Sequence, residues 1–248
     1  VLFKRHEALR TVFKEDGESQ KILPFYEFDI SLKDLSNSEN GESLIKEWQK
    51  EQVRTPFDLS NEILFRVSLA KVKEDEHLLC LTLHHLITDG WSFSIMLNEL
   101  KRVYISIAGN KEINLPASPS YRKFTEKQVT EENSSDLLEA EEFWLNEFND
   151  KIPVLDLPTD FPREVKPVFG SDEKSIDLTS EYIESLKLIN NLTAGTSFVT
   201  LLATFNVVLN HISKQDDFII GIHTAGQLHI GVINLVGYYV NLLPLRTK

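Results

Sequence analysis

The chain has 248 residues and a formal net charge of −12 at pH 7, with 42% hydrophobic and 26% charged residues. This composition is typical of a globular protein with a sizeable core, and the acidic balance argues against a nucleic-acid partner, because phosphate binding needs a basic face. No apolar run approaches the roughly 20 residues that span a bilayer, so we expect no membrane partner. The one cysteine, Cys80, cannot form a disulfide within the chain, which favours a reducing, cytoplasmic location.

The first third of the chain mixes helical and strand patterns. In chain order we expect a helix over 1–13, a strand over 21–28, a helix over 43–53, and strands over 64–72 and 77–83. The last two are separated by a short charged turn and are expected to pair. The run before His84 is apolar almost without a break, which predicts a buried strand.

The stretch 81–92, LTLHHLITDGWS, follows that strand and is the centre of the chain's organisation. Ser92 is expected to cap a helix over 93–107. The apolar stripe of that helix would be Ile95, Met96, Leu100, Val103, Tyr104 and Ile107.

The pair His84-His85 ends the apolar strand. Neighbouring residues of a strand point to opposite faces, so we predict that the two histidines do not share one cleft and do not share a metal ion. One should be buried and bonded, and the other free to accept a proton near neutral pH. The alternative is that both simply close a core strand and that Asp89 only makes a turn.

The rest of the chain repeats a mixture of helices and strands. We expect helices over 118–127, 137–148, 180–190 and 196–212, and strands over 174–178, 218–222 and 235–245. Trp144, Leu145 and Phe148 should be core, and the helix over 196–212, apolar nearly all round, should be buried. The proline-containing segment 149–175 reads as an extended crossover between two lobes.

Five stretches resemble one family in its own order. HHLITDG (84–90) fits HHxxxDG, which is typical of condensation domains of nonribosomal peptide synthetases. RHEALRTVF (5–13), residues 121–124, LPTDFPR (157–163) and LVGYYVNLLPLR (235–246) resemble four further motifs of that family. A single motif is weak evidence, but five in sequence identify the chain as a member over nearly its whole length.

The resemblance implies an α/β fold (an α+β sandwich) of two chloramphenicol-acetyltransferase-like lobes. Residues 1–160 would be the N-terminal lobe with its start missing, and 161–248 the first part of the C-terminal lobe with its end missing. The implied activity is amide formation between a carrier-bound acyl or peptidyl thioester donor and a carrier-bound aminoacyl acceptor. No cofactor is expected to bind directly. The substrates would arrive on the 4′-phosphopantetheine arms of donor and acceptor carrier domains, next to an adenylation domain.

The resemblance also assigns roles to residues of this chain. His85 would be catalytic or substrate-orienting, with His84 as its structural neighbour. Asp89 would hold the loop, and Gly90 would permit the turn. Arg10 would point toward this loop. Residues expected along the substrate channel are Trp91, Ser92, His223, Gln227 and Asn241. No metal ligand is implied.

The chain departs from the family pattern at several positions. Gln227 stands where an arginine commonly closes a GxxxxGR stretch and pairs with the motif's aspartate, so we expect Asp89 to lean on Arg10 instead. His223 replaces a common proline. Three alternatives therefore stay open. The first is an epimerisation domain, although the RHEALRT stretch favours condensation. The second is a non-catalytic condensation-like recruitment module, which Gln227 supports, and the third is an acyltransferase that uses coenzyme A.

Overall fold

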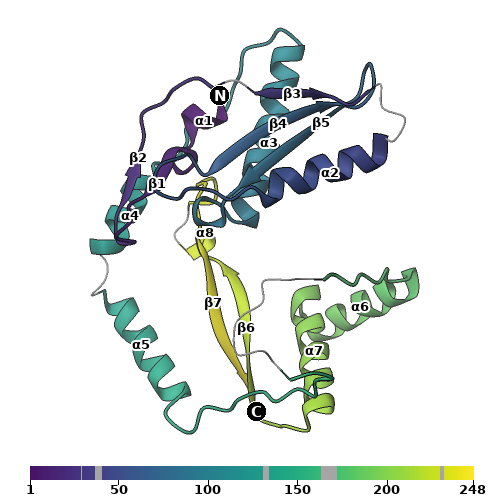
Figure 1. The fold of residues 1–248 in the computed structure, drawn as a ribbon. Helices are drawn as coiled ribbons and strands as arrows, with labels where there is room; N and C mark the ends of the chain where they lie inside the picture. The colour runs from purple at the N-terminus through teal and green to yellow at the C-terminus, as the bar shows by residue number, and fades with distance from the viewer. Residues whose placement is uncertain (29, 37–40, 131–133, 163–171, 230–231) are drawn as a thin grey trace. The chain divides into compact units, whose positions relative to one another are not determined.

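The computed structural model describes residues 1–28, 30–36, 41–130, 134–162, 172–229 and 232–248 (Figure 1). Its contacts divide the chain into two compact units. The first is Val1–Glu141 with His223–Asn241, and the second is Glu142–Ile222 with Leu242–Lys248. The predicted lobes, 1–160 and 161–248, have a single boundary in the sequence, whereas these two units have three. The predicted lobe boundary stays a prediction.

The first unit contains a three-stranded sheet of mixed direction. Strand β4 (Phe65–Lys71) lies in the middle, parallel to β3 (Ser31–Asp34) and antiparallel to β5 (His77–Leu83). Phe65 pairs with Leu83 and Lys71 with His77, so the predicted pairing of these two strands is confirmed.

Helix α2 (Gly41–Arg54) covers this sheet through one buried aromatic residue. Trp48 packs with Leu35 and Ala70, and Leu78 and Cys80 of β5 lie against the same cluster. Every second residue of β5 faces this helix because strand side chains alternate. The prediction that β5 is buried on both faces is wrong, since Leu79 on the other face is 41% exposed.

The N-terminal segment is more broken than its pattern predicts. A short helix α1 (Leu2–Arg5) and a 3-10 turn η1 (Glu7–Arg10) are followed by β1 (Thr11–Phe13), which pairs with β2 (Gln20–Ile22). The single helix over 1–13 is therefore wrong, and the strand over 21–28 ends at Ile22. Tertiary contacts override helix propensity here: His6 has an extended backbone, and Pro24 has no N–H to continue the pairing.

Helix α3 (Gly90–Ala108) crosses the core behind the sheet (Figure 1). Met96 joins the main cluster, which also contains Phe3, Ala8, Leu9, Leu64, Ile87 and Val236. The predicted stripe is only half right, because Tyr104 is 72% and Ile107 63% exposed. Asp89, and not Ser92, caps this helix: its side chain accepts a hydrogen bond from the Ser92 N–H.

A buried ionic cluster ties the N-terminal segment to α3. Glu99 Oε2 lies 2.7 Å from His6 Nε2, and Arg5 donates from Nε to both Glu99 oxygens at 3.0 Å. His6 Nδ1 lies 3.3 Å from Ser118 Oγ. Burial lowers the pKa of His6, and the hydrogen bond to Glu99 opposes this shift, so the neutral imidazole donates its Nε2–H to the carboxylate.

The remaining helices largely match expectation. These are α4 (Tyr121–Thr130), α5 (Ser135–Glu147), α6 (Ser180–Thr193), α7 (Ser197–Ser213) and the unexpected short α8 (Gly226–His229). The last two strands, β6 (Phe218–Ala225) and β7 (Val240–Thr247), pair with each other. The strand predicted over 174–178 is wrong, because those residues have no regular structure. Part of the predicted crossover, 163–171, lies outside the described residues.

Two burial predictions fail in the second unit. Leu145 is 66% exposed, and helix α7 is far from buried: Phe198 is 59% and Val207 68% exposed. Among the described helices, none is long and apolar enough by itself to cross a membrane, although α6 and α7, bent by 102°, pass the length and composition test as a pair.

Replacing Glu99 by alanine should lower the free energy of unfolding by about 3 kcal/mol. The side chains of Arg5 and His6 would stay buried after losing the carboxylate that both of them bind. The measurement is chemical denaturation followed by fluorescence. Glu47→Ala, on the exposed side of α2, is the matched control and should change stability by less than about 0.5 kcal/mol. Equal losses in the two variants would contradict a structural role for this cluster.

Candidate active site

A cavity of about 590 Å³ opens next to the carboxyl end of β5. Its walls are formed by His84, His85, Leu86, Gly90, His223, Tyr238 and Val240. Among the described residues that line it there is no carboxylate, ammonium or guanidinium group. The described residues also contain no group of three or more His, Cys, Asp or Glu side chains that could hold a metal ion. The chemistry available here is that of imidazoles on a largely neutral surface.

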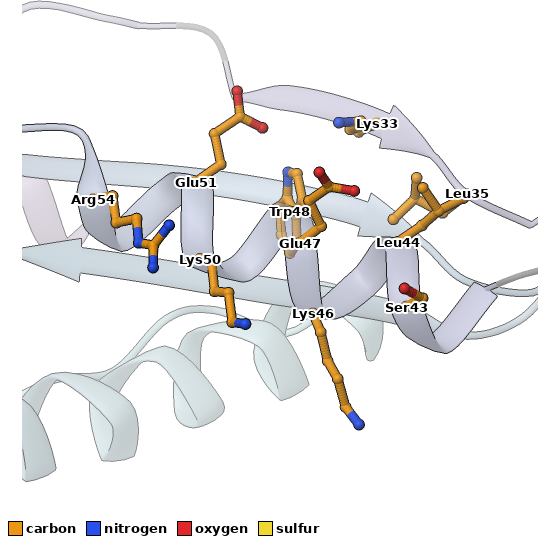
Figure 2. Close-up of a pocket in the computed structure, with 10 residues that line it drawn as sticks. All are labelled: Lys33, Leu35, Ser43, Leu44, Lys46, Glu47, Trp48, Lys50, Glu51 and Arg54. Atoms are coloured by element: carbon orange, nitrogen blue, oxygen red, sulfur yellow. The ribbon is translucent and has the colours of Figure 1, made fainter. Parts of the chain in front are cut away.

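A larger hollow, of about 850 Å³, lies between β3 and α2 and does not have these properties (Figure 2). It is lined mostly by charged side chains of both signs. In Figure 2 Lys46 and Lys50 point away from the strand that carries Lys33, so its cations do not converge on one spot. We therefore place the candidate site at the smaller cavity.

Both histidines of the motif line that smaller cavity, contrary to prediction. Strand β5 ends at Leu83, and residues 85–87 form a 3-10 turn (η2, His85–Ile87), so the alternation of a strand no longer applies at His84 and His85. His84 is half-buried, and its Nδ1 accepts a hydrogen bond from the Leu86 N–H at 3.2 Å. His85 is exposed to the cavity. The division into one bonded and one free imidazole is thus observed, although within a shared cleft.

The carboxylate of Asp89 holds the loop after the histidines. It is only 2% exposed. Oδ1 accepts from the Ser92 N–H at 2.8 Å, and Oδ2 accepts from the Tyr239 N–H at 3.1 Å. The side-chain amide of Gln227 donates to both oxygens, at 3.2 and 3.0 Å. One side chain therefore connects the start of α3 with α8 and with the residue before β7.

Gln227, and not Arg10, is the side-chain partner of Asp89. Arg10 bonds to the backbone carbonyls of Phe3 and Leu23, so the prediction that it points toward the loop is wrong. Gln227 is fully buried, and its Oε1 has no hydrogen-bond partner among the described residues. The aspartate is therefore connected to α8 through a neutral donor.

The other predicted residues fall into three groups. Ser92 and Trp91 fasten the segment before β7: Ser92 Oγ bonds to both the C=O and the N–H of Gly237, and the Trp91 indole donates to the Ile233 carbonyl. His223 and Gly90 line the cavity. Asn241 is exposed and is absent from its described lining.

Gly90 does not serve the turn as predicted. Its φ is outside the left-handed region, and a Cβ built there would meet nothing within 4 Å. A close approach of the backbone requires glycine elsewhere, at Gly226, where a Cβ would lie 2.3 Å from the carbonyl oxygen of Tyr239.

Three lining residues, Leu86, Tyr238 and Val240, were not predicted from the sequence. The ring of Tyr238 packs edge-on against the His85 imidazole, with centroids 5.3 Å apart and planes at 81°. Tyr238 occupies the variable position of the family's fifth motif, so no sequence signal marks it.

Tyr239, the residue between the lining residues Tyr238 and Val240, is buried. Its ring packs against Phe124 and Tyr121 at centroid distances of 4.8 and 6.0 Å. Burial, and then the proximity of Tyr121 and Asp89, raises the pKa of its hydroxyl, so it is a neutral phenol. This hydroxyl has no hydrogen-bond partner among the described residues.

Asp89→Asn should loosen the loop. The asparagine amide replaces one carboxylate oxygen by an NH₂ group, which cannot accept the hydrogen bonds that backbone N–H groups now donate to Asp89. We expect hydrogen exchange at the Ser92 and Tyr239 amides to become roughly five- to a hundredfold faster, as for the loss of a buried acceptor. Asp16→Asn is the matched control, since Asp16 accepts two backbone N–H groups at the surface. Unchanged exchange in Asp89→Asn would show that the carboxylate does not hold this loop.

Tyr239→Phe should leave stability unchanged or raise it by up to about 1 kcal/mol, because the change removes a buried hydroxyl without a partner. The thermal unfolding midpoint measures this, with Tyr104→Phe on exposed α3 surface as the control. A loss above about 1 kcal/mol would mean that the hydroxyl is bonded in solution.

The whole chain, residues 1–248, matches the family described as Condensation domain. It is 36% identical over 249 residues to gramicidin S synthase 2 of Aneurinibacillus migulanus and 34% identical over 248 residues to malpinin synthetase of Mortierella alpina. These alignments cover 100% and 99% of this chain, but it spans only 5% and 3% of those relatives' lengths.

Solved structures show the same mixed α/β fold. The first condensation domain of the calcium-dependent antibiotic synthetase matches with a TM-score of 0.78 at 21% identity, covering 98% of this chain and 58% of that one. The epimerization domain from the third module of tyrocidine synthetase B matches with a TM-score of 0.85 at 24% identity, covering 99% and 57%. The match over all 248 residues shows that the chain belongs to the condensation-domain family of nonribosomal peptide synthetases.

Proposed function

We propose that this chain belongs to a domain that forms an amide bond between an acyl or peptidyl thioester and an aminoacyl acceptor. The observation that carries the proposal is the exposed imidazole of His85 on a neutral cavity, next to a loop braced by Asp89, in a member of the condensation-domain family. The cavity provides a proton acceptor where an amine could meet a thioester carbonyl.

In this reaction the acceptor nitrogen forms a bond to the thioester carbonyl carbon, and the carbon–sulfur bond breaks. The amine loses one proton to His85, and the sulfur leaves as a thiolate that takes a proton back from the imidazolium. General-base assistance of this kind contributes about a hundred- to ten-thousand-fold. Holding the two reactants together can contribute up to roughly 7–11 kcal/mol of the barrier in well-oriented cases. The reaction requires no covalent intermediate on the protein.

The partners follow from the same proposal. Donor and acceptor carrier domains would deliver the substrates on 4′-phosphopantetheine arms, and an adenylation domain would lie nearby in a larger synthetase. A four-domain nonribosomal peptide synthetase, of which this chain matches 18%, supports such a setting. A cytoplasmic location stays a prediction.

We further propose that the domain has two chloramphenicol-acetyltransferase-like lobes, of which this chain holds most of the first and the beginning of the second. Coverage of 57–58% of the solved domains supports this, as does the apolar surface of α7. The remainder of the second lobe would cover that helix. Its backbone amides should exchange more slowly in a longer protein than in residues 1–248, and equal exchange would contradict the proposal.

His85→Ala, made in the full-length synthetase, should reduce amide formation about a hundred- to ten-thousand-fold, because the proton acceptor is lost. The amide product is quantified by mass spectrometry after the carrier domains are loaded. His77→Ala is the matched control, since His77 is exposed at the other end of β5 and does not line the cavity. An unchanged rate in His85→Ala would remove this residue from the mechanism.

Epimerisation is the second candidate, favoured by the match to the tyrocidine synthetase epimerization domain. The same imidazole could remove the α-proton of a carrier-bound aminoacyl group. Chiral analysis of the aminoacyl thioester, incubated without an acceptor, separates the two: conversion to the D-form would favour epimerisation, and retention of the L-form supports amide formation.

A further inference from the structure

The imidazole of His85 has no hydrogen bond to either ring nitrogen among the described residues. Its neighbour His84 differs, because Nδ1 of that ring accepts from the Leu86 N–H, and so does the buried His6, whose two nitrogens both have partners. A histidine that handles protons is commonly oriented by a hydrogen bond to its second nitrogen. In this site the orientation has to come from another contact.

The His85 ring packs against the ring of Tyr238, with centroids 5.3 Å apart and planes at 81°. Such edge-to-face aromatic pairs have a definite geometry, because the positive edge of one ring meets the negative face of the other. The pair also leaves both nitrogens of His85 free for a substrate.

The backbone of Tyr238 is itself held on both sides. Gly237 bonds through its N–H and its C=O to Ser92 Oγ, and the N–H of Tyr239 bonds to Asp89. The ring of the next residue, Tyr239, packs against Phe124. Tyr238 thus reaches the cavity from a fixed position, while its own side chain is 47% exposed.

We propose that Tyr238 is a positioning residue that orients the His85 imidazole toward the reacting groups. The inference rests on the proposed amide-forming function of His85. The aromatic ring carries the effect, and the phenolic hydroxyl does not. Because orientation matters most in the transition state, loss of the ring should lower kcat and leave KM nearly unchanged.

The test compares Tyr238→Phe, which keeps the ring, with Tyr238→Leu, which removes it, in the full-length synthetase. Tyr238→Phe should retain the kcat of the unmodified protein. Tyr238→Leu should lower kcat about two- to tenfold, the range expected for one lost aromatic pair. Tyr104→Leu is the matched control, as Tyr104 is 72% exposed on α3, and its kcat should not change.

A second measurement does not depend on turnover. Diethyl pyrocarbonate modifies accessible neutral imidazoles, and peptide mass spectrometry reports the rate at each histidine. His85 should react about two- to tenfold faster in Tyr238→Leu than in Tyr238→Phe, because the imidazole loses the aromatic ring that packs against one side of it and restricts the approach of the reagent. The rate at the exposed His77 should stay equal in both variants, and the buried His6, which is 2% exposed, should stay protected in both, which shows that they are folded.

The outcomes separate this inference from the proposed function. Equal His85 labelling and equal kcat in the leucine and phenylalanine variants would overturn the role of Tyr238. A loss of kcat in Tyr238→Phe as large as in Tyr238→Leu would also overturn it, since the hydroxyl would then carry the effect. If His85→Ala keeps full amide formation, the proposed function of His85 is wrong. The role of Tyr238 in that reaction is then wrong as well, even if His85 is labelled faster in Tyr238→Leu.

Discussion

The candidate site depends on one buried carboxylate. Asp89 accepts backbone N–H groups from two separate segments and the side-chain amide of a third. Through these bonds the loop after His85, the first turn of α3 and the residue before β7 are joined at a single point. The cavity walls contributed by Tyr238 and Val240 exist where they do because that segment is bound there.

A buried carboxylate usually needs a cation or several donors. Here the donors suffice without a described cation, and the position of Asp89 explains why. It is the N-cap of a 19-residue helix, where the helix dipole and the free N–H groups stabilise negative charge. The neutral side chain of Gln227 is therefore enough to connect the aspartate to α8.

The two units differ in how far their apolar residues are covered. In the first, Trp48, Met96 and Leu64 are buried, with exposures of 4%, 3% and 0%. In the second, α7 keeps exposed phenylalanine and valine side chains along much of its length. Periodicity reports that a helix is apolar, but burial also depends on a partner surface, and the described contacts of α7 with α6 leave most of its apolar side chains exposed.

From the sequence alone, the pairing of β4 with β5, the helices α2, α5, α6 and α7, and the family itself could be predicted, because they depend on local periodicity and on short motifs. The partner of Asp89, the shared cavity of His84 and His85, and the contact of Tyr238 could not. Gln227 is 138 residues from Asp89 and Tyr238 is 153 residues from His85, and no local pattern specifies which side chains meet across such separations. Only the packing of the chain decided them, through the 3-10 turn that follows β5 and the bonds that bring the segment before β7 back to α3.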